Sequence, residues 1–143
     1  MPNPTGVDRS AKFVPVWVVV MVISGILLMT AGAVIALLKP AMLVSPGDPI
    51  SAAVKVYAGY LVSRNLAVAL ALLAALLLRD RRALTILMIL TALIQLFDTG
   101  LDIVEGRWAL VPGVLVFALV YLAGAHRISE GPLWRLGVRR EIH

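Results

Sequence analysis

Two ionisable residues, Arg64 and Asp98, lie inside long apolar stretches of this 143-residue chain. If those stretches are antiparallel helices that reverse at the charged residues 79–82, Arg64 and Asp98 lie at the same depth. An ionised side chain inside a membrane span costs on the order of 3 kcal/mol, so such residues usually face the interior of a helix bundle and mark a functional site. We therefore expect a cation to face an anion there, in a setting suited to proton-transfer chemistry.

Further polar side chains share the faces of these two stretches. On the third stretch the spacings of four, three, four and three residues put five of them on one helical face. These are Thr91, Gln95, Asp98, Asp102 and Glu105. On the second stretch the corresponding stripe is Tyr57, Tyr60 and Arg64, flanked by Asn65. If the two faces meet, two carboxylates flank one guanidinium, and they can divide into an ionised base and a protonated acid.

The elements that position these residues are four apolar stretches, at residues 13–38, 52–78, 83–104 and 108–125. The chain is 61% hydrophobic and 15% charged, and about 20 apolar residues cross a hydrocarbon core roughly 30 Å thick. Backbone polar groups in lipid must be satisfied internally, and the stretches lack two-residue alternation, so helices are predicted rather than a barrel. The short connections at residues 79–82 and 105–107 indicate antiparallel neighbours. We predict one all-α domain, residues 1–143, folded as an antiparallel four-helix membrane bundle.

Positive charges near the ends of the stretches predict the orientation. One side collects Arg9, Lys12, Arg79, Arg81, Arg82, Arg127, Arg135, Arg139 and Arg140, whereas the other has Lys39, Lys55 and Arg107. This bias favours a multi-pass protein of the inner or plasma membrane with both termini in the cytoplasm. Orientation and anionic lipid also explain the net charge of +5, so nucleic acid is not an expected partner. The mixed apolar and basic tail, residues 128–143, fits a segment on the membrane surface.

The depth of the polar faces predicts a pocket for a lipophilic small molecule that carries one polar group. The chain has no cysteine, which excludes thiolate chemistry and cysteine metal sites. His126 stands at a helix end, where a cation complements the helix dipole, so we expect neither a metal nor a cofactor. Trp108 fits an interfacial anchor or the mouth of the pocket.

The polar cluster resembles, in residue types, the Asp-Arg-Asp site of soluble limonene-epoxide hydrolases. The resemblance implies that Asp98 activates a water, Arg64 orients the carboxylates and Asp102 protonates the opening epoxide oxygen. It also implies that Asn65, Tyr60 and Gln95 position water or substrate. The same groups could instead move a proton on the substrate, as an isomerase or cyclase does.

As a whole chain, the sequence resembles the small four-helix bacterial membrane proteins grouped as DoxX-like. This likeness covers about residues 57–124 and rests on the Arg64-Asn65 step followed by Asp98 late in the third stretch. Those families largely lack an assigned activity, so the likeness implies a fold more than a function.

Three functions remain open at this point. The first is an enzyme that acts on a lipophilic small molecule, with epoxide hydrolysis or isomerisation as the expected reaction. The second is an accessory or structural subunit in which Arg64 and Asp98 form only a register-fixing ion pair. The third is a small proton-coupled carrier, which would need a polar route through both halves of the bundle. Small residues at every fourth position from Gly59 to Ala75 are compatible with close helix packing and with a homodimer.

Overall fold

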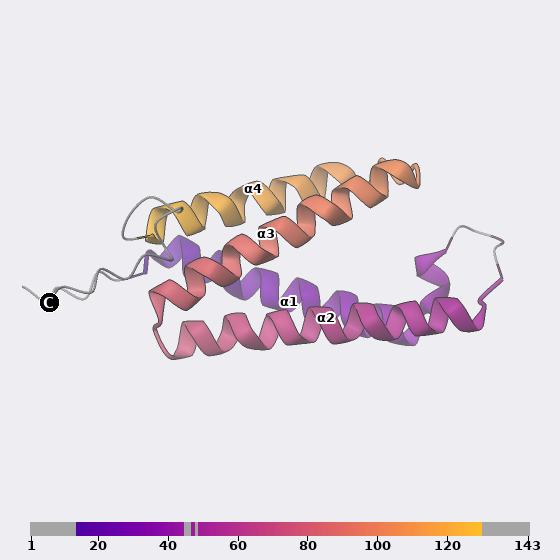
Figure 1. Cartoon of the computed structure of the whole chain (residues 1–143), viewed down its shortest axis with the longest axis horizontal. Helices are drawn as coiled ribbons and strands as arrows, with labels where there is room; N and C mark the ends of the chain where they lie inside the picture. The colour runs from indigo at the N-terminus through magenta and orange to yellow at the C-terminus, as the bar shows by residue number, and fades with distance from the viewer. Residues whose placement is uncertain (1–13, 45–46, 48, 130–143) are drawn as a thin grey trace, which may run out of the picture.

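The protein is built from four α-helices that run back and forth along one direction (Figure 1). A computed structural model describes residues 14–44, 47 and 49–129. The helices are α1 (Val16–Leu38), α2 (Ala52–Leu77), α3 (Arg81–Val104) and α4 (Val111–Ile128), and a short 3-10 helix, Pro40–Leu43, follows α1. No strand occurs within these described ranges. The architecture is therefore the all-α four-helix bundle that the sequence predicts.

All four helices are long and apolar enough to cross a membrane. Their outward faces carry large apolar side chains such as Leu27, Leu70 and Val116, which in a water-soluble bundle would be replaced by polar residues. We conclude that this is a multi-pass membrane protein. The predicted surface tail lies outside the described residues from position 130 onward.

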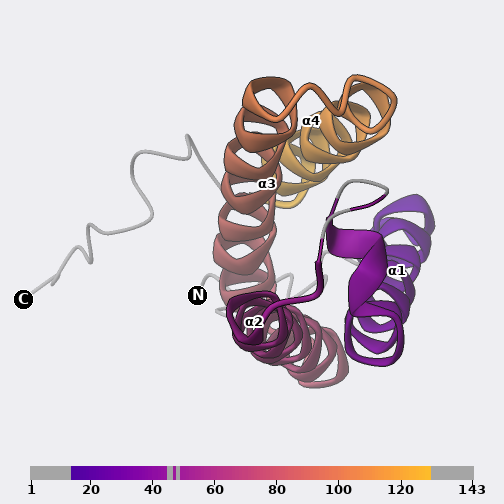
Figure 2. The same cartoon turned by 90° about the vertical axis from the view of Figure 1, so that its right-hand side faces the viewer.

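The helices form two antiparallel hairpins. Helix α1 packs along α2, and α3 packs along α4, whereas α2 with α3 and α1 with α4 make fewer contacts. The two hairpins are close together where α2 is joined to α3, and they diverge toward the opposite end (Figures 1 and 2). We call these the Arg79 end and the Arg107 end of the bundle.

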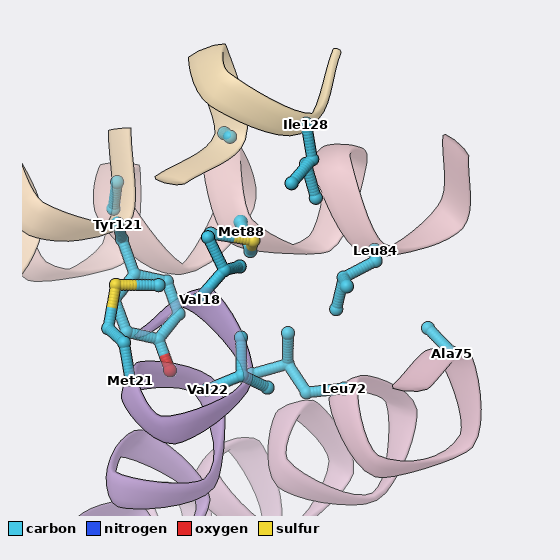
Figure 3. Close-up of a cluster of buried hydrophobic side chains, with 11 residues drawn as sticks. Val18, Met21, Val22, Leu72, Ala75, Leu84, Met88, Tyr121 and Ile128 are labelled. Carbon is cyan, nitrogen blue, oxygen red and sulfur yellow. The ribbon is translucent and has the colours of Figure 1, made fainter. Parts of the chain in front are cut away.

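The apolar core lies toward the Arg79 end, because it includes Ala75 of α2 and Leu84 of α3, which flank the turn there. Figure 3 shows this cluster. All four helices contribute buried side chains to it, among them Val22, Leu72, Met88 and Tyr121. Glycine at position 124 leaves room for the Met88 and Met21 side chains, because a Cβ there would stand 2.5 Å and 3.0 Å from their methyl carbons. Each side chain in this cluster loses contact with lipid and gains close packing, which is the main force that holds helices together in a membrane.

The turns at the two ends follow from local sequence. At the Arg79 end, Arg79 adopts a φ of 55°, and the Asp80 side chain caps α3 by accepting a hydrogen bond from the Ala83 amide at 3.0 Å. At the Arg107 end, Gly106 has a φ of 71°, and the Arg107 amide donates to the Asp102 carbonyl at 2.7 Å. This is the Schellman arrangement, in which a glycine with positive φ ends a helix and folds the chain back.

Candidate functional site

Arg64 and Asp98 form a two-pronged ion pair between α2 and α3. Arg64 Nη1 donates to Asp98 Oδ1 at 3.2 Å, and Arg64 Nη2 donates to Asp98 Oδ2 at 3.0 Å. The antiparallel register that places the two residues at one level is thus present in the structure. Such bidentate, charge-assisted pairs combine strength with a fixed geometry.

This ion pair lines a partly open pocket of about 300 Å³ to which residues from all four helices contribute. That volume is at the lower end of the range of small-molecule sites. The lining residues are Gly25, Leu28 and Met29 of α1, Leu61, Arg64, Asn65 and Val68 of α2, Thr91, Ile94, Gln95 and Asp98 of α3, and Gly113, Val114 and Phe117 of α4. Polar groups from two neighbouring helices therefore face a largely apolar wall.

The pocket gathers four of the residues that the sequence assigns to a site: Arg64, Asp98, Asn65 and Gln95. Thr91, from the same polar face of α3, also lines it. The Thr91 hydroxyl donates to the Leu87 carbonyl at 2.8 Å, so its oxygen remains an acceptor. Arg64 Nε is buried and has no hydrogen-bond partner among the described residues.

Three expected binding residues lie elsewhere. Tyr57, Tyr60 and Trp108 are 55%, 74% and 64% exposed, and none of them lines the pocket. Amphipathic aromatic side chains at the ends of membrane helices are typical of the lipid–water interface. Their position favours anchoring in the bilayer over contact with a ligand in this pocket.

Asp102 does not flank Arg64 as the sequence suggested, because its carboxylate pairs with Arg107. Arg107 Nε lies 3.1 Å from Asp102 Oδ1 and 3.3 Å from Glu105 Oε2. Asp102 is buried, and it is not among the residues that line the pocket. The described contacts therefore give the pocket one carboxylate, Asp98, and place the second at the end of α3.

Sequence reasoning placed the site residues on the second and third stretches and missed the contribution of α1 to the pocket. Gly25, Leu28 and Met29 of α1 form part of the wall. The sequence did contain an indication of close packing there, because a glycine such as Gly25 within an apolar helix often marks the close approach of another group. Across the described part of the chain, no three His, Cys, Asp or Glu side chains come together in the way that metal ligands do.

Comparison with protein-family models, with curated proteins and with solved structures found no match. Any function for this chain therefore has to be argued from the pocket itself.

Proposed function

We propose that this protein is an enzyme of the inner or plasma membrane, with both termini in the cytoplasm, that acts on a lipophilic small molecule in the Arg64–Asp98 pocket. The reaction class that we propose is the opening of an epoxide, by water or by isomerisation. One observation carries the proposal: a carboxylate and a guanidinium, held together in a fixed geometry, face a mostly apolar pocket of about 300 Å³.

The hydrolytic reaction needs a base and a group that stabilises negative charge on oxygen. Each oxygen of Asp98 accepts one hydrogen bond from Arg64 and keeps capacity to accept another from a water molecule. Asp98 takes a proton from that water, the water oxygen bonds to an epoxide carbon, and the carbon–oxygen bond of the ring breaks. The released oxygen then receives the proton from Asp98, so epoxide and water give a diol.

Arg64 and the two amides supply the remaining hydrogen bonds. Arginine stays protonated in proteins, so the Arg64 guanidinium stabilises the developing oxyanion as a donor without giving up its proton. Asn65 and Gln95 line the same pocket as the pair, where their amides can hold the water or the substrate oxygen. If the reaction is an isomerisation instead, Asp98 removes a proton from the carbon beside the ring. That proton ends on the ring oxygen as the ring opens, which gives an allylic alcohol.

A non-catalytic accessory subunit is the second candidate. The observation in its favour is that Asp98 is satisfied by Arg64 on both oxygens, as a purely structural link between α2 and α3 would be. The carrier receives less support, because the apolar core of all four helices lies between the pocket and the Arg79 end.

Turnover of lipophilic epoxides in water labelled with heavy oxygen tests the proposal. We expect wild type to place the label in the diol and folded Asp98→Asn to lose at least a hundredfold in rate, as loss of an acid–base group typically does. Glu105→Gln is the matched control, because Glu105 is an exposed carboxylate of the same helix end. Absence of turnover by folded wild type, or full turnover by Asp98→Asn, would favour the accessory subunit.

A further inference from the structure

The Tyr121 hydroxyl is a buried polar group that the chemistry above does not use. Tyr121 is 0% exposed, and its ring packs against Phe117 with centroids 5.2 Å apart. Its hydroxyl has no hydrogen-bond partner in the described part of the chain. A buried hydroxyl without a partner costs about 1–3 kcal/mol relative to a satisfied one.

This hydroxyl adjoins the wall of the pocket. It points from α4 toward α1 (Figure 3) and lies where a side chain at position 25 would otherwise stand, since a Cβ added to Gly25 would collide with it. Gly25 and Phe117, the two residues next to the hydroxyl, both line the pocket. Tyr121 itself is not among the lining residues, so its buried hydroxyl stands directly behind the part of the wall that Gly25 and Phe117 form.

The hydroxyl lies at the opposite end of the pocket from the ion pair. Gly124 of α4 faces Met88 of α3. Because the two helices are antiparallel, Tyr121, three residues before Gly124, lies level with Thr91, three residues after Met88. Thr91 precedes Asp98 by seven residues, which corresponds to about 10 Å along a helix. The pocket thus has the ion pair near one end and Thr91 near the other, and the Tyr121 hydroxyl lies behind the wall at the level of Thr91.

We propose that Tyr121, beside Gly25, forms a second polar subsite that donates a hydrogen bond to an oxygen of the ligand about 10 Å from the group held by Arg64 and Asp98. This inference rests on the proposed function, because it concerns the ligand of the same pocket. The ligand class is an elongated lipophilic molecule with an oxygen function at each end. At that separation Tyr121 cannot exchange a proton with the reacting group, so it is a positioning residue that selects among substrates.

Two primary amides of equal size provide the probes: undecanamide and ω-hydroxydecanamide. The amide end offers an acceptor oxygen to Arg64 and donors to Asp98. It has no epoxide ring, so the proposed reaction cannot consume the probe. The other end is a methyl group in the first probe and a hydroxyl in the second. Their dissociation constants are measured by calorimetry with full-length wild type, Tyr121→Phe and Asp98→Asn in lipid nanodiscs.

For each protein we divide the affinity for the hydroxyl probe by the affinity for the methyl probe, and we then divide the wild-type ratio by the Tyr121→Phe ratio. The two probes partition unequally into lipid, but they do so equally with both proteins, so this effect cancels in the quotient. We expect this quotient to be about fivefold in favour of the hydroxyl probe, the worth of one neutral hydrogen bond. Thermal unfolding of Tyr121→Phe should be unchanged or raised, since phenylalanine fills the same space without an unpaired hydroxyl.

The outcomes separate the two proposals. A quotient of one, with both probes weakened by Asp98→Asn, would overturn the Tyr121 subsite and leave the proposed function standing. If neither probe binds wild type, or if Asp98→Asn leaves both affinities unchanged, the proposed function fails and the subsite fails with it.

Discussion

The Arg64–Asp98 pair can hold the bundle together and can also do chemistry, and a charge swap separates the two roles. Asp98→Asn leaves Arg64 without its counter-charge, which we expect to cost about 1–3 kcal/mol because both side chains are only partly buried. The double variant Arg64→Asp/Asp98→Arg restores an ion pair between α2 and α3. It should recover most of the stability while turnover stays lost, because the carboxylate has moved to the other helix. Thermal unfolding and diol formation, measured on the same samples, check this; turnover in the double variant would contradict it.

Asp102 should behave as a structural residue. Asp102→Asn removes the close partner of Arg107, which still lies 3.3 Å from Glu105. We expect about 1–2 kcal/mol of destabilisation and a rate within twofold of wild type. Urea-induced unfolding in detergent and the labelled-water assay measure the two quantities. A fall in rate as large as that of Asp98→Asn would show that Asp102 takes part in the reaction.

The sequence predicted the ion-pair partner of Asp98 but not that of Asp102. The partner of Asp98 followed from the register of two antiparallel helices, which depends only on the position of the turn. The partner of Asp102 depends on the glycine turn after α3. Arg107 is five residues further on, and in a continuous helix it would point away from Asp102. The positive φ of Gly106 folds the chain back and brings Arg107 within 3.1 Å.

Among the elements, α1 and α4 are in close contact at Gly25. A methyl group at this position meets the Tyr121 ring and hydroxyl and the Phe117 ring, none of which can move without disturbing the core. We expect Gly25→Ala to cost about 1–3 kcal/mol by overpacking. Gly100→Ala is the matched control, since nothing lies within 4 Å of a Cβ there, and it should gain up to about 1 kcal/mol from helix propensity. Equal melting temperatures for the two variants would contradict the close approach.

At this scale the sequence predicted the four helices well and their ends less well. Helices α2 and α3 end or begin within two residues of the expected stretches, because Asp80 is a strong capping residue next to a charged turn. Helix α4 is shifted by three residues at each end, from 108–125 to Val111–Ile128. Its start is set by Pro112, which favours the first turn of a helix, and its last turn includes the polar residues His126 and Arg127. A hydropathy pattern alone detects neither the proline that starts the helix nor the polar residues of its last turn.

The molecule as a whole has a predicted orientation that single cysteines can test, because the chain has none of its own. Ala41 and Leu78 are both exposed. Ala41 belongs to the 3-10 helix that follows α1, and Leu78 follows the last residue of α2, so they lie at opposite ends of the bundle. A membrane-impermeant maleimide should label Ala41→Cys in intact cells, and it should label Leu78→Cys only after the membrane is permeabilised. This follows from the arginines at the Arg79 end. The reverse pattern would place the Arg107 end of the bundle on the cytoplasmic side of the membrane.

The division into two hairpins also bears on how the protein is made. Each hairpin has its own close helix contacts, so each can insert into the bilayer as a unit during synthesis. Arg64 is delivered with the first hairpin and Asp98 with the second, and each is a lone charge in lipid until the hairpins dock. Because an unpaired charge at that depth is costly, docking is favoured most where the two charges meet. Because residues of both hairpins line the pocket, the pocket forms only when the hairpins dock and Arg64 and Asp98 neutralise each other.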